Sequence, residues 1–358
     1  MIPIVAETYA RFHQALHLRL RTLARGRWAS QCRPTSIALL LTERCNARCL
    51  HCDIWKNRGK EERPTANQWK TVLCDLRRWL GPVHVVLTGG EALLAPFATD
   101  LVAYGSKLGL LIELLTHGYW LDKSRIEKLA RTQPWRVTMS LDGLGETHDL
   151  VRGRKRFFAT ATSSLGVLCR ARRQTHWPVH IRLKTVIMEH NLGSVCEVAR
   201  FARQQGVEVF YQPIEQNYNA PEDSQWFEHS PNWPKDPERA ARVVEQLIAL
   251  KRQGLPIANS YEQLRVMIRY FRNPNALRVL TQNHQAHDLP VCAALTTLQI
   301  QANGDVKACW KMPAVGNIKT DAVRSLWEHR PRYWERVCCL SEITFAAAGI
   351  ASHDTVVT

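Results

Sequence analysis

The pattern of apolar residues predicts six short strands that alternate with helices between residue 36 and about residue 212. Several strand runs, such as IALLL and VHVVL, are almost continuously apolar, which is typical of a parallel sheet covered on both faces. The predicted strands are 36–42, 83–88, 111–116, 136–142, 179–187 and 207–212, and the predicted helices are 67–80, 95–108, 122–132, 158–174 and 191–205. This alternation predicts right-handed βαβ units, arranged as an open sheet or as a partial barrel.

The pattern changes after residue 213. Residues 213–237 are rich in Pro, Asn, Trp and acidic residues, which indicates a long loop or linker. Helices are predicted at 238–253 and 261–272, and a smaller unit follows from residue 289. Within that unit, Asn303-Gly304 between two β-rich runs predicts a hairpin.

Length and composition fit a folded protein without membrane spans. The chain has 358 residues, of which 45% are apolar, enough to bury a sizeable core. No run reaches the roughly 18 apolar residues that a membrane helix needs. The N-terminus is interrupted too often by arginine to be a secretory signal, at Arg11, Arg19, Arg21, Arg25 and Arg27. We therefore expect a cytoplasmic protein without a membrane partner.

The net charge of +16 is compatible with a nucleic-acid partner, an acidic membrane surface or an anionic substrate. The basic residues are spread along the chain, which favours a basic protein without a dedicated nucleic-acid surface. The densest block, residues 11–33, fits an amphipathic helix with Phe12, Leu16, Leu20 and Leu23 on one side. A helix packed on the domain and an RNA-binding arm both explain this block.

Three of the 11 cysteines lie within eight residues, directly after the first predicted strand. Cys45, Cys49 and Cys52 have the spacing C-x3-C-x2-C, and in a reducing compartment such a group indicates metal binding before disulfides. Three thiolates can hold three irons of a four-iron cluster and leave the fourth iron open. The alternatives are a zinc knuckle that uses His51 as a further ligand, or unrelated core thiols.

The cysteine motif resembles the signature of the radical S-adenosylmethionine (SAM) superfamily. Gly89-Gly90-Glu91 after the second strand is similar to the Gly-Gly-Glu motif that contacts the methionyl amino group in that family. Thr116 follows the third strand, and the next residue is His117 where many relatives have Asn.

The motifs after the fourth and sixth strands extend the resemblance. Ser140-Leu141-Asp142-Gly143, followed by Val151-Arg152-Gly153, is similar to the pattern of peptide-maturing members. There the serine and the arginine reach the ribose or carboxylate of SAM, and an arginine fork does match a carboxylate. A surface ion pair is the alternative for Arg152. The resemblance implies cofactor contacts at Gly89, Gly90, Glu91, Thr116, Ser140, Asp142, Arg152 and Gln212.

The resemblance also implies a fold and an activity. The expected fold is α/β, a partial (β/α)6 TIM-type barrel with ligands at the carboxyl ends of its strands. The expected segments are a basic helical segment at 1–35, the radical SAM core at 36–215, a linker with helices at 216–288, and a small α+β extension at 289–358.

The implied chemistry begins at a [4Fe–4S] cluster on the three loop cysteines. One electron passes to SAM and yields methionine and a 5′-deoxyadenosyl radical, which abstracts hydrogen from a peptide or cofactor precursor. A flavodoxin or ferredoxin would be the reductant. A radical SAM enzyme that modifies RNA, and a non-catalytic zinc- or nucleic-acid-binding protein, are the alternatives.

Four later cysteines resemble the twitch or SPASM extension of such enzymes, together with the hairpin and Gly316-Asn317-Ile318. They are Cys292, Cys309, Cys338 and Cys339. Two of them are adjacent and none follows, so two auxiliary clusters are excluded by count. The resemblance implies one auxiliary [4Fe–4S] cluster, and a truncated extension without a cluster is the alternative. About eight irons per chain would indicate the former and about four the latter.

Overall fold

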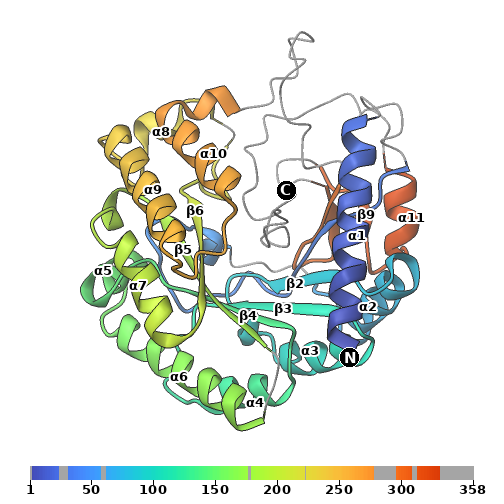
Figure 1. Cartoon of the computed structure of the whole chain (residues 1–358). Helices are drawn as coiled ribbons and strands as arrows, with labels where there is room; N and C mark the ends of the chain where they lie inside the picture. Colours follow the sequence, from blue (N-terminus) through green and yellow to red (C-terminus); the bar gives the residue numbers. More distant parts are fainter. Residues whose placement is uncertain are drawn as a thin grey trace.

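The computed structural model describes residues 2–23, 31–57, 62–175, 179–221, 223–277, 296–308 and 313–330. Its centre is a nine-stranded sheet in the order β6-β5-β4-β3-β2-β1-β7-β8-β9. Strands form an inner layer and most helices lie outside it (Figure 1). Within the described ranges, no helix is long and apolar enough to cross a membrane.

The first six strands are joined by helical crossovers. The strands are β1 (Ser36–Leu40), β2 (His84–Thr88), β3 (Leu111–Thr116), β4 (Arg136–Ser140), β5 (His180–Ile187), β6 (Glu208–Pro213), β7 (Thr297–Ile300), β8 (Asp305–Lys307) and β9 (Gly316–Asn317). The α-helices are α1 (Ile2–Leu23), α2 (Ala66–Leu80), α3 (Ala98–Lys107), α4 (Ser124–Arg131), α5 (Gly145–Arg152), α6 (Phe157–Thr175), α7 (Val195–Gln205), α8 (Trp226–His229), α9 (Pro237–Arg252), α10 (Tyr261–Arg272) and α11 (Val323–Glu328). Short 3-10 helices are η2 (Ile54–Lys56), η3 (Ala92–Leu94), η4 (Glu189–Asn191) and η5 (Pro274–Leu277). All neighbouring pairs from β6 to β7 are parallel, whereas β7-β8 and β8-β9 are antiparallel.

The two faces of the parallel strands differ in polarity. Outward residues pack under the helices and are fully apolar, for example Val85, Ile112 and Val137, each at 0% exposure. Inward residues alternate with them and include charged and polar side chains. One cavity is lined by residues from every strand between β6 and β7, so the sheet must curl around it. The architecture is the expected partial barrel.

Local sequence signals start several of the helices. Thr65 and Gln68 form a capping box at α2, as Ser260 and Gln263 do at α10. Asp236 caps α9, whose first residue is Pro237.

The six predicted strands and the helices between them are confirmed to within a few residues. Helix α5 was not predicted, because its eight residues lie in what reads as a loop between β4 and α6. The hairpin at Asn303-Gly304 is confirmed by the antiparallel pair β7-β8. Strand β7 also pairs with β1, so the hairpin continues the sheet of the core. The division into four segments stays a prediction.

Helix α1 forms as expected, but it packs through a different face. Phe12 and Leu16, predicted to pack, are 65% and 41% exposed, whereas Ala6 and Ala10 are buried. The small alanines let the helix lie close to the barrel, where they contact Leu111 at the start of β3. A prediction based on the large apolar side chains alone therefore identified the wrong face of the helix.

Candidate active site

The cysteine loop (residues 41–53) is held between two other loops at the carboxyl end of the barrel. On one side, the Gly90 N–H donates to Thr42 O at 2.7 Å and the Glu91 N–H donates to Arg44 O at 2.9 Å. On the other side, the Arg48 N–H donates to Arg152 O at 3.2 Å. The loop is thus fixed by the backbone after β2 and by the end of α5.

Two glycines make this close packing possible. A Cβ at Gly89 would lie 2.2 Å from Thr42 O, and one at Gly153 would lie 2.2 Å from Arg48 O. Both glycines have positive φ, at 146° and 68°. Only glycine fits these positions, because both the space and the backbone conformation exclude a side chain. Gly89, part of the predicted cofactor motif, therefore also makes room for the cysteine loop.

The three loop cysteines gather in one cluster with Ala47, Phe157 and Ala161. Burial raises the pKa of Cys45 to about 12 and that of Cys52 to about 11, and the neighbouring thiols raise both further. A thiolate is therefore unfavourable here without a nearby positive charge such as a metal supplies.

Glu91 is 1% exposed and its carboxylate is fixed by three hydrogen-bond donors. Its Oε1 accepts from Thr116 Oγ1 at 2.9 Å and from the Leu93 N–H at 3.1 Å. Its Oε2 accepts from the His117 N–H at 2.8 Å and lies 3.3 Å from His117 Nε2. This network orients a carboxylate that borders the cysteines.

His117 has a defined hydrogen-bonding role at this position. Its Nδ1 accepts from the Tyr119 N–H at 2.9 Å, so in the neutral ring Nε2 carries the proton. Burial lowers the pKa of His117, which favours that neutral form. Nε2 then donates to Asn46 Oδ1 at 2.6 Å. His117, which stands where many relatives have Asn, thus lies between Glu91 and the cysteine loop and contacts both.

Arg152 joins the cysteine loop to the end of β4. Its Nη2 lies 2.6 Å from Asp142 Oδ2, and its Nη1 donates to Cys49 Sγ at 3.4 Å. Asp142 is fully buried and also accepts from the Val186 N–H at 2.9 Å. Its carboxylate is thus occupied in positioning Arg152. The Arg152 Nε has no hydrogen-bond partner within the described residues.

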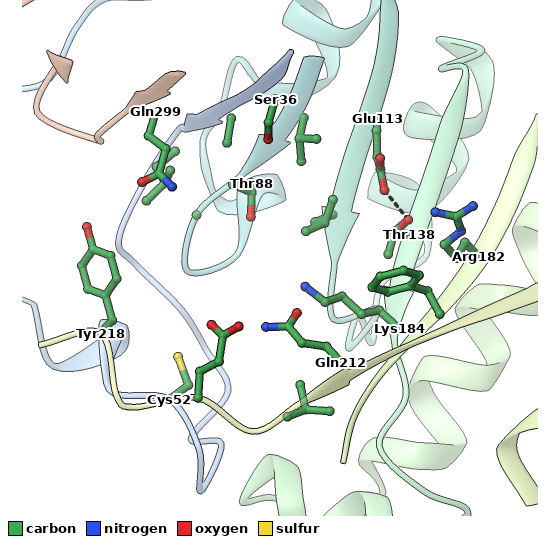
Figure 2. A pocket seen from close by; sticks show the side chains of 18 of the residues that line it. Ser36, Cys52, Thr88, Glu113, Thr138, Arg182, Lys184, Gln212, Tyr218 and Gln299 are labelled. Atoms are coloured by element: carbon green, nitrogen blue, oxygen red, sulfur yellow. Dashed lines mark hydrogen bonds between the residues drawn. The ribbon is translucent and has the colours of Figure 1, made fainter. Parts of the chain in front are cut away.

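Two connected hollows occupy this end and the interior of the barrel. The cluster cleft, about 170 Å³, is lined by the three cysteines and by most of the predicted cofactor residues, namely Gly89, Gly90, Glu91, Thr116, Ser140 and Arg152. The barrel lumen, about 440 Å³, runs below it, and Cys52, Thr88 and Lys184 line both. Figure 2 shows Lys184 and Gln212 extending into the lumen from β5 and β6.

The structure brings most of the predicted site residues together. Gln212 lines the lumen rather than the cleft, and Asp142 lines neither. Sequence reasoning considered His51 only as a zinc ligand, but His51 lines both hollows and its Nδ1 has no partner among the described residues. Its position between two cysteines was the available signal. The cofactor roles of these residues stay predictions, and Cys292, Cys309, Cys338 and Cys339 lie outside the described residues.

The residues present fit an iron–sulfur cluster better than a single metal ion. Among the described side chains, no group of three or more His, Cys, Asp or Glu converges tightly enough to hold one ion. A cubane needs thiolates on separate irons, so they need not converge on one point. The cleft meets that requirement with three thiols and partnerless polar atoms on His51 and Arg152.

Comparison with known proteins shows which family and which enzymes this chain resembles. Residues 39–177 match the family model of the Radical SAM superfamily. The chain is 25% identical over 307 residues to the AdoMet-dependent heme synthase of Methanosarcina barkeri, covering 83% of this chain and 82% of that protein. It is 30% identical over 178 residues to the sporulation killing factor maturation protein SkfB of Bacillus subtilis, covering 49% of this chain and 42% of that protein.

A solved structure supports the fold. The crystal structure of Streptococcus suis SuiB bound to S-adenosylmethionine superposes with a TM-score of 0.63 at 17% identity, covering 84% of this chain and 67% of SuiB. Enzymes of the matched superfamily use a [4Fe–4S] cluster and SAM. Residues 39–177, which include the cysteine loop and the glutamate motif, therefore match a Radical SAM domain, and the domain together with the relatives indicates an enzyme.

Proposed function

We propose that this chain binds a [4Fe–4S] cluster through Cys45, Cys49 and Cys52 and cleaves SAM reductively to modify a peptide or a cofactor precursor. The observation that carries the proposal is the cluster cleft, which is lined by three cysteines together with Glu91 and Arg152. When bound, the cluster would supply the electron that converts SAM to methionine and a 5′-deoxyadenosyl radical.

The residues of the chain would bind and orient the cofactor. Glu91 offers a carboxylate to the methionyl ammonium, and its three donors hold that carboxylate in place. The Arg152 Nε offers a donor to an anionic oxygen of the cofactor. Part of the lumen wall is apolar and would keep water away from a reactive radical; it includes Val86, Leu115 and Val186.

The substrate class follows from the relatives. One relative is a heme synthase and another matures a sporulation killing factor, so cofactor precursors and peptides are the two classes supported. The lumen of about 440 Å³ lies in the range of small-ligand sites, so it would accommodate one reacting group rather than a whole peptide. We propose a small reduced iron–sulfur or flavin protein as the electron donor.

The test is anaerobic reconstitution of the full chain with iron and sulfide, followed by reduction in the presence of SAM. Cys45→Ala, Cys49→Ala and Cys52→Ala should each abolish formation of 5′-deoxyadenosine and lower bound iron. Cys196→Ala is the matched control, because Cys196 lies on α7, outside both hollows, and should leave both readouts unchanged.

A triple cysteine variant that still forms 5′-deoxyadenosine would refute the assignment. The iron count of the wild-type chain also addresses the auxiliary cluster: about four irons excludes it and about eight supports it.

A further inference from the structure

Exposed basic residues lie on the cysteine loop, directly after it and on the segment that clamps it. The two segments are in contact, because the Arg48 N–H donates to Arg152 O at 3.2 Å and Gly153 packs against the backbone of Arg48. None of these basic residues lines the cluster cleft or the lumen, so they lie beside the cysteines but outside both hollows. This basic patch consists of Arg48, Lys56, Arg154, Lys155 and Arg156.

The charges of the basic patch are not neutralised by ion pairs. Among the described residues, none of its five side chains pairs with an acid, whereas the exposed Lys128 pairs with Asp100 at 3.0 Å. Asp149 lies beside the patch, but its carboxylate accepts from the backbone N–H groups of Arg156 and Phe158. The patch therefore presents a net positive charge to solvent, which attracts an acidic partner.

Two aromatic rings connect the basic patch with the cysteines. The Arg48 guanidinium lies 4.6 Å from the centre of the Trp55 ring, and Trp55 Nε1–H donates to Cys52 O at 2.9 Å. The Arg154 guanidinium lies 4.9 Å from the centre of the Tyr119 ring, which packs in the cluster of the three loop cysteines. A single layer of side chains thus separates the patch from the thiols. Because the rate of electron transfer falls steeply with distance, this layer is a short route for an electron.

Exposed apolar side chains accompany the charges. Leu50 and Leu150 are 39% and 56% exposed. They belong to the two segments that carry most of the patch, which are also joined by a hydrogen bond of 2.9 Å from the Leu50 N–H to Val151 O. Protein interfaces combine apolar contacts with a charged rim, and those of transient redox complexes are small. Two leucines beside five cations fit such an interface.

We propose that the basic patch docks an acidic protein that delivers electrons to a cluster on the cysteine loop. This inference rests on the proposed function, because it assigns the electron donor a binding surface. A partner on the patch lies next to the cysteines without entering the hollows, so it can deliver an electron but cannot present a substrate to the cleft. For each SAM cleaved, the donor is oxidised by one electron, and that electron is consumed as the C5′–S bond breaks.

The test compares two electron donors on the reconstituted full chain, with formation of 5′-deoxyadenosine as the readout. Dithionite is small and needs no docking surface, whereas the probe, a reduced plant-type ferredoxin, is an acidic protein. Arg154→Glu/Lys155→Glu should lower the rate with limiting ferredoxin about tenfold at low salt and leave the rate with dithionite within about twofold of wild type. The ferredoxin-driven rate of the wild-type chain should also fall as salt is added, because salt screens the attraction.

Arg170→Glu/Arg173→Glu is the matched control, because it changes the net charge equally at the far end of α6 and should leave both rates unchanged. Equal losses in the two double variants, or an equal loss with both donors, would overturn the proposal. So would an unchanged ferredoxin-driven rate in the patch variant, or a wild-type chain that dithionite supports and ferredoxin does not.

Carbodiimide cross-linking followed by mass spectrometry gives a second readout that needs no turnover. Lys155 should couple to ferredoxin carboxylates, whereas Lys107, exposed at the end of α3, should not. Cross-links at Lys107 but not at Lys155 would contradict the docking site. A chain that forms no 5′-deoxyadenosine with dithionite would refute the proposed function instead, and the cross-links would still decide where the acidic protein binds.

Discussion

The two ends of the barrel both bury charged side chains, but they use them differently. At the amino end, Glu113 accepts from Arg136 and from Thr138, and α1 lies over this end with Glu7 bonded to Trp135. At the carboxyl end, Arg152, His51 and Gln212 each keep a polar atom without a partner among the described residues. The comparison teaches that buried charge alone does not mark a ligand site. The three partnerless atoms at the carboxyl end, together with the thiols beside them, mark the candidate ligand site instead.

The largest effect is expected at the amino end. Glu113→Gln removes the counterion of buried Arg136, which should lower the free energy of unfolding by about 3–5 kcal/mol. Urea unfolding followed by tryptophan fluorescence measures it. Asp100→Asn, which removes the exposed partner of Lys128, should cost less than about 1 kcal/mol. A Glu113→Gln chain as stable as wild type would show that the pair of Glu113 with Arg136 contributes nothing.

The next effect concerns the clamp on the cysteine loop. Gly153→Ala places a Cβ against Arg48 O and should cost about 1–3 kcal/mol while lowering iron retention. Gly145→Ala is the matched control at the other end of α5, because its φ is also positive, at 53°, and no atom lies within 4 Å of the added Cβ. Iron analysis and thermal melts of the two variants separate the effect of the steric clash, present only in Gly153→Ala, from the effect of backbone strain, present in both. Equal losses would mean that the clamp contact is unimportant.

Two titratable groups, His148 near the carboxyl end and Glu208 at the amino end, should differ in their response to acid. Burial, followed by Arg152, lowers the pKa of His148 to about 3, so its contribution to stability is complete above pH of about 6.5 and is lost as pH falls toward 3. At the amino end, burial would raise the pKa of Glu208, but His180 and Arg182 lower it to about 2. Its contribution is therefore lost only below about pH 4.5.

Melting temperatures measured between pH 7 and pH 5 report on His148, because in this range Glu208 still makes its full contribution to stability. His148→Asn keeps an acceptor for the Asp142 N–H and removes the titrating ring. The variant should lose less stability than wild type over this range, by up to about 1.4 kcal/mol per pH unit. Parallel pH profiles for the two chains would contradict the assignment to His148.

The smallest effect is expected on the outer face of α1. Phe12→Ser should change the free energy of unfolding by no more than about 0.5 kcal/mol, because Phe12 is 65% exposed. Ala10→Leu, on the packed face, should cost about 1–3 kcal/mol through overpacking. A larger loss in Phe12→Ser would indicate that this face is covered. Chemical unfolding of both variants provides the measurement.

The six parallel strands and the helices between them could be predicted from the sequence because they depend on local patterns of apolar residues, and the cysteine motif could be recognised from its spacing. The inward networks could not. Glu113 and Arg136 lie 23 residues apart, and only the register of β3 against β4 brings them together. The role of Gly153 was equally hidden, because its neighbour Arg48 comes from a loop more than a hundred residues earlier. Contacts that depend on register and loop packing require the three-dimensional structure.

The parallel pairing of β7 with β1 has a consequence for any shortened form of this enzyme. Strand β1 leads directly into the cysteine loop, and its free edge is covered by residues 297–300. A chain ending before that segment would leave a row of unsatisfied amide and carbonyl groups beside the cysteine loop. Such an edge templates strand addition between molecules, so truncation would invite self-association as well as remove the later cysteines.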